Sequence, residues 1–150
     1  MNIKKIDIAL IKFFRRTSIP LARFGLFLIF FWFGLLKVVG LSPASDLVKQ
    51  LFEVTIPWMS FPTFFILFGV FEMLIGILFV IRGLERIVIP LLFLHMIVVS
   101  MPLFLLPNTW TGFLVPTMEG QYIIKNIALI AVGVGLAAHL QPMKNLPFSK

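Results

Sequence analysis

The fold of this chain is decided by residues 61–82, FPTFFILFGVFEMLIGILFVIR. The apolar run is about 20 residues long, which is the length an α-helix needs to cross the hydrocarbon core of a bilayer. One acidic residue, Glu72, lies near its middle. A carboxylate at that depth is costly unless it is neutral or paired, so Glu72 marks a candidate functional site whose partner must be found.

The composition of the whole chain indicates a membrane protein. Of its 150 residues, 60% are hydrophobic and 13% are charged, and so few charges could not cover this much apolar surface in water. The chain has no cysteine, which excludes disulfides, thiolate metal sites and thiol relays. Its net charge of +7 comes from Lys and Arg residues that flank the apolar segments, so it indicates membrane topology and not a nucleic-acid partner.

The apolar segments predict an all-α fold, an integral membrane bundle of four transmembrane helices in one domain over residues 19–141. Each predicted span has about 20 residues, hence a length of roughly 30 Å. Pro20 is expected to open the first span, and Pro102 is expected to kink the third. The predicted spans are residues 19–39, 61–81, 87–106 and 122–140.

Two shorter helices are predicted outside the spans. In residues 1–18, apolar side chains recur at helical spacing opposite Lys5, Lys12 and Arg16. This pattern is typical of a basic amphipathic helix lying on an anionic leaflet, and a loosely ordered basic tail is the alternative. Residues 42–52 predict a short interfacial helix on the outer membrane surface, with Ser42 as its N-cap.

The positions of the charges predict one orientation. Lys and Arg crowd the N-terminal segment, the 82–86 turn and the tail at 142–150, whereas the expected outer loop at 107–121 carries only Glu119. Because positive residues stay on the cytoplasmic side, both termini are expected there. The chain is therefore expected to be a multi-pass protein of the bacterial inner membrane.

Four spans contribute polar residues to a predicted site. At about 1.5 Å per residue, Glu72 and His95 lie near mid-depth, while Lys37 and Lys125 lie about 5 Å inside the outer boundary. We expect a funnel that opens outward, with a basic mouth and an acid–imidazole floor. The alternatives are that the lysines snorkel to the headgroups, that His95 is a neutral core imidazole, and that Glu72 is protonated and bonded to backbone.

Three further residues are candidates for this polar pocket. Tyr122 and Asn126 lie on turns adjoining Lys125, and Trp32 at mid-helix either lines the pocket or faces lipid. No metal-ligand cluster is recognisable, so no metal is predicted. Gly69 and Gly76 lie near the helix face that bears Glu72, which indicates that this face packs inward.

Three segments together resemble the DoxX-like superfamily of small four-span bacterial membrane proteins. They are RFG to FGLLK at residues 23–37, GVFEMLIG at 69–76 and GQYIIKN at 120–126. The shared pattern is a glycine–lysine end to the first span, an acid–glycine second span and a glycine–aromatic–lysine entry to the fourth. The resemblance covers most of residues 20–140.

The resemblance implies a four-helix membrane bundle often associated with redox or sulfur-stress functions. One family member is a subunit of a thiosulfate:quinone oxidoreductase, and another forms a membrane complex with superoxide dismutase. The leading hypothesis is therefore an accessory component of a membrane-linked redox or oxidative or sulfur-stress process. Its outward-facing polar pocket would hold a small anion or a quinone head group, so a quinone is the candidate cofactor.

Other readings of the function stay open at this point. One is a small proton-coupled transporter in which Glu72 is the coupling site, and another is a membrane scaffold or chaperone without a ligand. Besides the lipid bilayer, the candidate partners are a soluble redox protein and a second copy of the chain. Whether the protein is itself an enzyme is left open.

Overall fold

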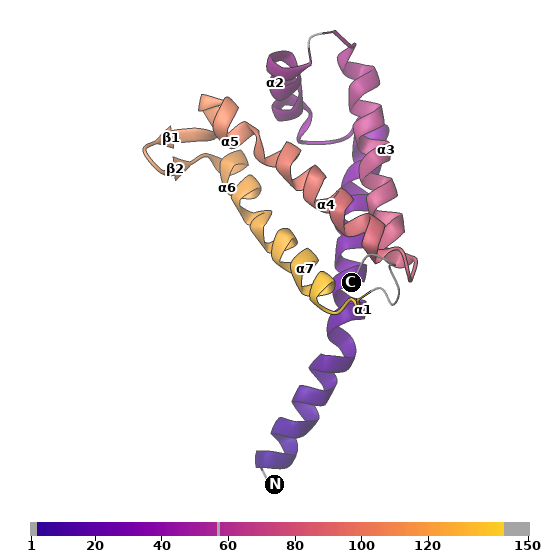
Figure 1. The fold of residues 1–150 in the computed structure, drawn as a ribbon. Helices are drawn as coiled ribbons and strands as arrows, with labels where there is room; N and C mark the ends of the chain where they lie inside the picture. The colour runs from indigo at the N-terminus through magenta and orange to yellow at the C-terminus, as the bar shows by residue number, and fades with distance from the viewer. Residues whose placement is uncertain (1–2, 57, 143–150) are drawn as a thin grey trace, which may run out of the picture.

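The computed structural model describes residues 3–56 and 58–142 and is mostly helical (Figure 1). Within this part of the chain, four helical stretches are long and apolar enough to cross a membrane, as the sequence predicted. They are Ile3–Val38, Phe61–Val80, Glu85–Leu105 and Met118–Ala138. The first two are the helices α1 (Ile3–Val38) and α3 (Phe61–Val80), and the other two are each divided into two helices.

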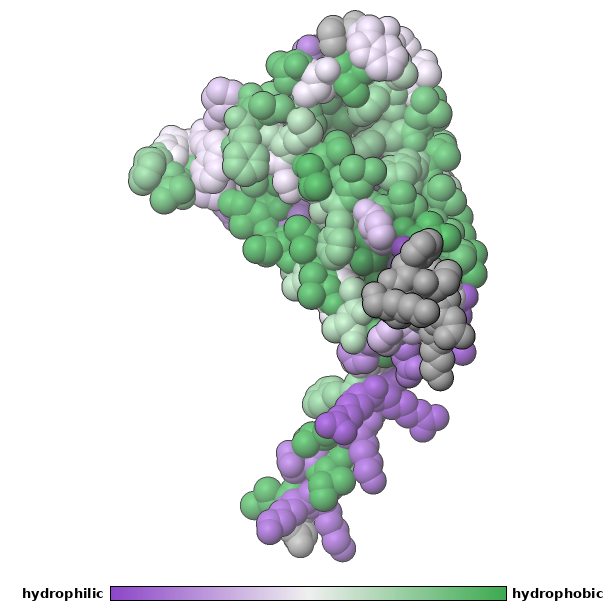
Figure 2. All heavy atoms as spheres, viewed as in Figure 1, coloured by the Kyte–Doolittle hydropathy of each residue, from purple (hydrophilic) through white to green (hydrophobic). Residues whose placement is uncertain are grey.

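Helix α1 corrects the expected boundary at Pro20. It runs without interruption for 36 residues, through Pro20, although proline cannot donate the backbone hydrogen bond to the Arg16 carbonyl. The residues on both sides keep helical geometry, and the Thr17 hydroxyl donates to the Phe13 carbonyl at 2.9 Å. Residues 3–16 are all exposed. We call Ile3–Ser18 the N-terminal arm, which projects beyond the bundle in Figures 1 and 2.

Helices α1 and α3 run antiparallel and touch through glycines. A Cβ atom on Gly34 would lie 2.5 Å from the Gly69 carbonyl oxygen, and one on Gly69 would lie 2.7 Å from the Gly34 carbonyl oxygen. Further along, a Cβ on Gly76 would lie 2.8 Å from the Phe31 nitrogen. Only glycine allows backbones to approach this closely. The prediction that Gly69 and Gly76 face inward is confirmed.

The apolar core lies where α1, α3, the first part of the third span and the end of the fourth span meet. The outside of the bundle is also apolar, as the green surface of its body in Figure 2 shows. A chain that is apolar both inside and outside is suited to lipid and not to water. The buried core residues are Leu26, Phe30, Ile75, Phe79, Val88, Ile89, Leu92, Met96 and Leu136.

The third and fourth long helical stretches are each interrupted once. The third consists of α4 (Glu85–Ser100) and α5 (Pro102–Leu105), so the predicted interruption at Pro102 is confirmed. The fourth consists of α6 (Met118–Lys125) and α7 (Ile127–Ala138), which meet at Asn126.

The end of the bundle opposite the N-terminal arm has more structure than the sequence predicted. Helix α2 (Ser45–Thr55) confirms the short helix, but its N-cap is Ala44 and not Ser42. The Ser42 hydroxyl instead accepts from the Ala44 nitrogen at 3.3 Å. The expected loop holds a 3-10 turn, η1 (Pro107–Thr109), and an antiparallel hairpin of β1 (Trp110–Gly112) and β2 (Val115–Pro116).

Contacts between distant segments define the two ends of the bundle. Near the arm, Arg86 donates to the Gln141 carbonyl, and Arg23 pairs with Glu85. At the opposite end, Asn108 donates to the Gln50 side chain at 2.6 Å, which joins η1 to α2. The expected tail lies outside the described residues from position 143 onward.

Candidate functional site

Glu72 is paired on both of its carboxylate oxygens. Lys37 Nζ donates to Oε2 at 2.7 Å, and His95 Nε2 lies 3.2 Å from Oε1. The three residues come from α1, α3 and α4 and are only 6%, 5% and 3% exposed, in the order Lys37, Glu72, His95. We call them the Lys37–Glu72–His95 cluster. Sequence reasoning named all three as candidates, and the structure brings them together.

The glycine contact between α1 and α3 places Lys37 at this position. Lys37 follows Gly34 by three residues, and Glu72 follows Gly69 by three residues, so each lies on the face that carries the contact. A Cβ on Gly69 would lie only 2.8 Å from the Lys37 Cβ. The stem of the lysine is therefore held against α3, and its ammonium group turns inward instead of snorkelling to the outer headgroups.

The cluster brings one carboxylate together with an amine and an imidazole. Lys37 Nζ donates a hydrogen bond to Glu72 Oε2, whereas His95 Nε2 lies within ion-pair distance of Oε1. Hydrogen bonds between charged partners are the strong ones. The second ring nitrogen, His95 Nδ1, is buried and has no hydrogen-bond partner among the described residues. Since a buried ion pair adds little net stability, a cluster of this kind is a functional-site hypothesis by default.

Aromatic rings surround the imidazole. Phe68 is stacked on His95 with ring centroids 5.2 Å apart, Phe30 meets it edge-on at 5.4 Å, and Phe71 lies at 6.0 Å. Lys37 Nζ also lies 5.6 Å from the centroid of the Phe68 ring. Phe68 thus contacts both basic members of the cluster. The sequence analysis missed this residue, although its position one turn before Glu72 puts it on the same helix face.

A column of phenylalanine rings connects the cluster with the outer helix α2. Phe52 on α2 is buried and lies 4.9 Å from Phe64, and Phe64 is stacked on Phe68 at 5.6 Å. We call Phe52, Phe64 and Phe68 the aromatic column. It lies between the cluster and α2, where the sequence predicted a basic mouth.

The other four candidates lie elsewhere in the described structure. Lys125 is exposed, and its Nζ lies 4.9 Å from the ring centroid of Tyr122, which is itself 62% exposed. Asn126 is partly buried where α6 meets α7. Trp32 is 56% exposed on the outside of α1, which fits the alternative that it faces lipid. Of the two predicted lysines, Lys37 pairs with Glu72 and Lys125 lies beside Tyr122.

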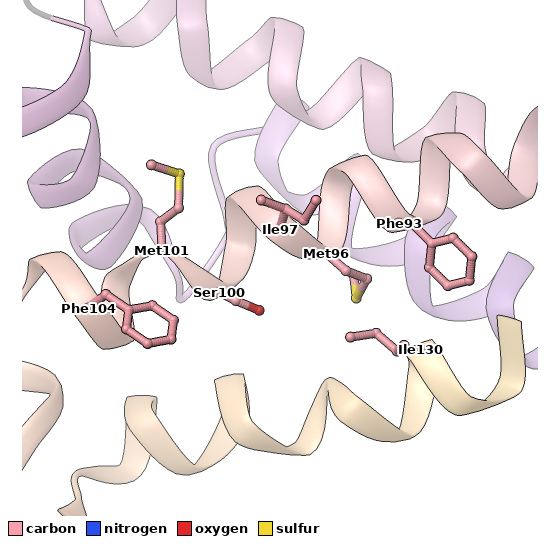
Figure 3. Close-up of a pocket in the computed structure, with 7 residues that line it drawn as sticks. All are labelled: Phe93, Met96, Ile97, Ser100, Met101, Phe104 and Ile130. Carbon is pink, nitrogen blue, oxygen red and sulfur yellow. The ribbon is translucent and has the colours of Figure 1, made fainter. Parts of the chain in front are cut away.

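Two apolar hollows lie away from the cluster. The larger, of about 390 Å³, lies between α4–α5 and α7, and Figure 3 shows the side chains of Met96 and Ser100 beside Ile130. The smaller, of about 170 Å³, lies between α1 and α7 and has Ser18 and His139 at its edge. No residue of the Lys37–Glu72–His95 cluster lines either hollow.

Neither metal chemistry nor a known relative adds to this site. Over residues 3–56 and 58–142, no group of three or more His, Cys, Asp and Glu side chains could hold a metal ion. The resemblance to DoxX-like proteins remains a prediction from the sequence. No family model, curated protein or solved structure matches the chain.

Proposed function

We propose that this chain is a DoxX-like protein of the bacterial inner membrane that acts as an accessory component of a membrane-linked redox or stress-defence process. In this proposal the Lys37–Glu72–His95 cluster handles protons for a quinone head group. The observation that carries the proposal is the convergence of three ionisable side chains from three spans, each at least 94% buried. Ionisable residues inside membrane spans are rare and mark proton relays and ligand sites, so they are a functional-site hypothesis by default.

Of the two ligands expected from the sequence, the cluster favours the quinone over a small anion. The cluster combines one basic side chain, Lys37, with one acidic side chain, Glu72, so it does not concentrate positive charge as an anion site would. Lys125, the second cation of the expected mouth, is exposed beside Tyr122. A neutral, flat ring suits this site better than an anion does, and the stacking of Phe68 on His95 is the kind of contact that such a ring would make.

The chemistry balances with the groups at the cluster and one external partner. Reduction of a quinone to a quinol takes up two electrons and two protons. The electrons would come from a redox protein partner, and the protons would pass through the Glu72 carboxyl and the His95 imidazole. Lys37 would donate a hydrogen bond to the quinone oxygen as negative charge develops on it. The ring would enter where Phe68 now lies, after that side chain turns aside.

Binding of a short-chain benzoquinone to the full chain in lipid nanodiscs tests this proposal. We expect the carbonyl stretching band of the bound quinone to shift to lower frequency because Lys37 or His95 donates to it. We expect Lys37→Met to weaken binding at least tenfold and to remove the shift. Lys125→Met is the matched control, since this lysine is exposed beside Tyr122. Equal binding by wild type and Lys37→Met, or no binding at all, contradicts the quinone role.

A proton-coupled transporter is the second candidate, and one observation favours it. The cluster lies between the aromatic column on one side and the apolar core on the other, which includes Phe30 and Phe79. A buried acid that is shielded on both sides is compatible with alternating access, in which the two sides would open in turn. Proton uptake by proteoliposomes in the absence of quinone, lost in Glu72→Gln, would support the transporter over the redox role.

The orientation is part of the same proposal, with both termini cytoplasmic. The 82–86 turn, the end of α7 and the basic arm share one end of the bundle, and the hairpin loop lies at the other. The positive-inside rule then places the arm in the cytoplasm. We expect a reporter that is active only in the periplasm to be active when fused in loop 107–121 and inactive when fused at Lys150. The opposite result would invert the orientation.

A further inference from the structure

The N-terminal arm has two opposite faces and stands clear of the bundle. One face carries Ile3, Ile6, Leu10, Phe13 and Phe14, and the other carries Lys4, Lys5, Lys12, Arg15 and Arg16. The apolar side chains are between 37% and 82% exposed. The arm carries five basic residues and one acidic residue, Asp7, so its net charge is positive. A helix of this kind in water leaves its apolar face without cover, and its charge favours an anionic surface.

The apolar face of the arm continues the lipid-facing side of the span. Leu21, Phe24, Leu28 and Trp32 are between 47% and 67% exposed on α1, and the helical period places them in line with Leu10, Phe14 and Thr17. The basic face of the arm continues the opposite side, which holds the buried Leu26, Phe30 and Lys37. Because of this register, swinging the arm outward from the bundle turns its apolar face toward the bilayer without any rotation about the helix axis.

A weak point for this bend lies where the arm joins the bundle. Pro20 cannot donate to the Arg16 carbonyl, so one hydrogen bond of the helix is missing there. One turn earlier the Thr17 hydroxyl bonds the Phe13 carbonyl at 2.9 Å, a contact that often bends helices. The first residue of α1 packed against the core is Ile19. Within the arm, Ser18 lines the small hollow between α1 and α7, and residues 3–16 are exposed, so the bend disturbs packing only at the base of the arm.

We infer that the N-terminal arm bends outward at Thr17–Pro20 and binds the surface of the anionic cytoplasmic leaflet. The apolar face enters the boundary of headgroups and acyl chains, and the basic residues meet the lipid phosphates. This inference rests on the proposed membrane insertion and orientation, and it is independent of the redox role.

Spin labels on the full chain test this inference, because the absence of cysteine allows single sites to be labelled. Leu10→Cys and Ile8→Cys form a matched pair, since both replace exposed apolar residues of the arm on opposite faces. In nanodiscs of equimolar phosphatidylcholine and phosphatidylglycerol, we expect the label at 10 to collide with oxygen in the hydrocarbon. The label at 8 is expected to collide with a water-soluble nickel complex. A label at Leu28→Cys, in the span, reports membrane insertion separately.

The contribution of charge to membrane binding by the arm is tested at the salt concentration at which about half of the arms are bound. Each basic residue near an anionic surface changes the binding equilibrium roughly fivefold. We therefore expect Lys12→Gln to lower the ratio of membrane-bound to free arms by about fivefold. Lys49→Gln, which removes an exposed lysine on α2, is the control and should have no effect. Nanodiscs of phosphatidylcholine alone should also release the arm.

Two results would overturn the inference. Equal exposure of the labels at 8 and 10 to the nickel complex, with the label at 28 in hydrocarbon, would show a straight arm in water. Dipolar coupling between labels at position 10 on two molecules would show that a second copy covers the apolar face instead.

Discussion

Glu72→Ala is expected to lower the free energy of unfolding by about 3–5 kcal/mol, because it leaves a buried charge without its partner. The ammonium group of Lys37 is 2.7 Å from the carboxylate and only 6% exposed, so it loses its acceptor in a buried position. Glu72→Gln should cost less, because its carbonyl oxygen still accepts from Lys37. Denaturant unfolding of the full chain in detergent measures both values.

Two variants separate the effect of charge from the effect of shape. The double variant Lys37→Met/Glu72→Leu replaces the pair with apolar side chains, and such replacements are often neutral or stabilising by about 1–4 kcal/mol. We therefore expect it to recover most of the stability that Glu72→Ala loses while binding no quinone. Glu119→Ala is the control, since this exposed acid should change stability by less than about 0.5 kcal/mol.

The single variant Glu72→Leu tests whether the cluster contributes to stability or to cellular activity. If the carboxylate is paired as the structure has it, leucine strands the Lys37 charge and the protein is destabilised. If Glu72→Leu matches the wild type in both stability and cellular activity, the cluster has no role, and the bundle is better described as a scaffold.

The four long apolar helical stretches could be predicted because length and hydropathy are local properties of the sequence. The partner of Glu72 needed more than depth, since Lys37 and Lys125 lie equally far inside the outer boundary. The two lysines differ in the helix face on which each one lies. Gly34 precedes Lys37 by three residues and Gly69 precedes Glu72 by three, so matching small-residue faces select Lys37. The corresponding position before Lys125 is Tyr122, which cannot make such a contact.

Other features depend on contacts that a single segment does not reveal. The strands β1 and β2 are three and two residues long, too short for an alternating pattern to be recognised. Pro20 has two readings in the sequence, because proline is tolerated in a first turn and also occurs within helices in membranes. The aromatic column joins residues of α2 and α3, so the spacing along one helix could indicate only part of it.

Gly69→Ala is expected to destabilise the protein by about 1–3 kcal/mol, the usual cost of overpacking a well-packed contact. The added Cβ would lie 2.7 Å from the Gly34 carbonyl oxygen and 2.8 Å from the Lys37 Cβ. Neither atom can move away unless the backbone of α1 moves with it. The same unfolding measurement in detergent gives this value.

Gly25→Ala is the matched control for this substitution. A Cβ atom on Gly25 meets nothing within 4 Å, and alanine favours a helix over glycine by about 1 kcal/mol. Gly25→Ala should therefore be neutral or slightly stabilising. A lower free energy of unfolding in Gly69→Ala, with an unchanged or higher one in Gly25→Ala, would show that Gly69 acts through the contact between α1 and α3 and not through helix propensity.

The double variant Gly34→Ala/Gly69→Ala tests whether the two glycines form one contact. Once the first methyl group has moved α1 away from α3, the second finds room, so the combined loss should be smaller than the two single losses added together. The same movement takes Lys37 away from Glu72, so Gly69→Ala should also weaken quinone binding, while Gly25→Ala should leave it unchanged. Wild-type stability and binding in Gly69→Ala would mean that the close approach of these helices does not hold the cluster together.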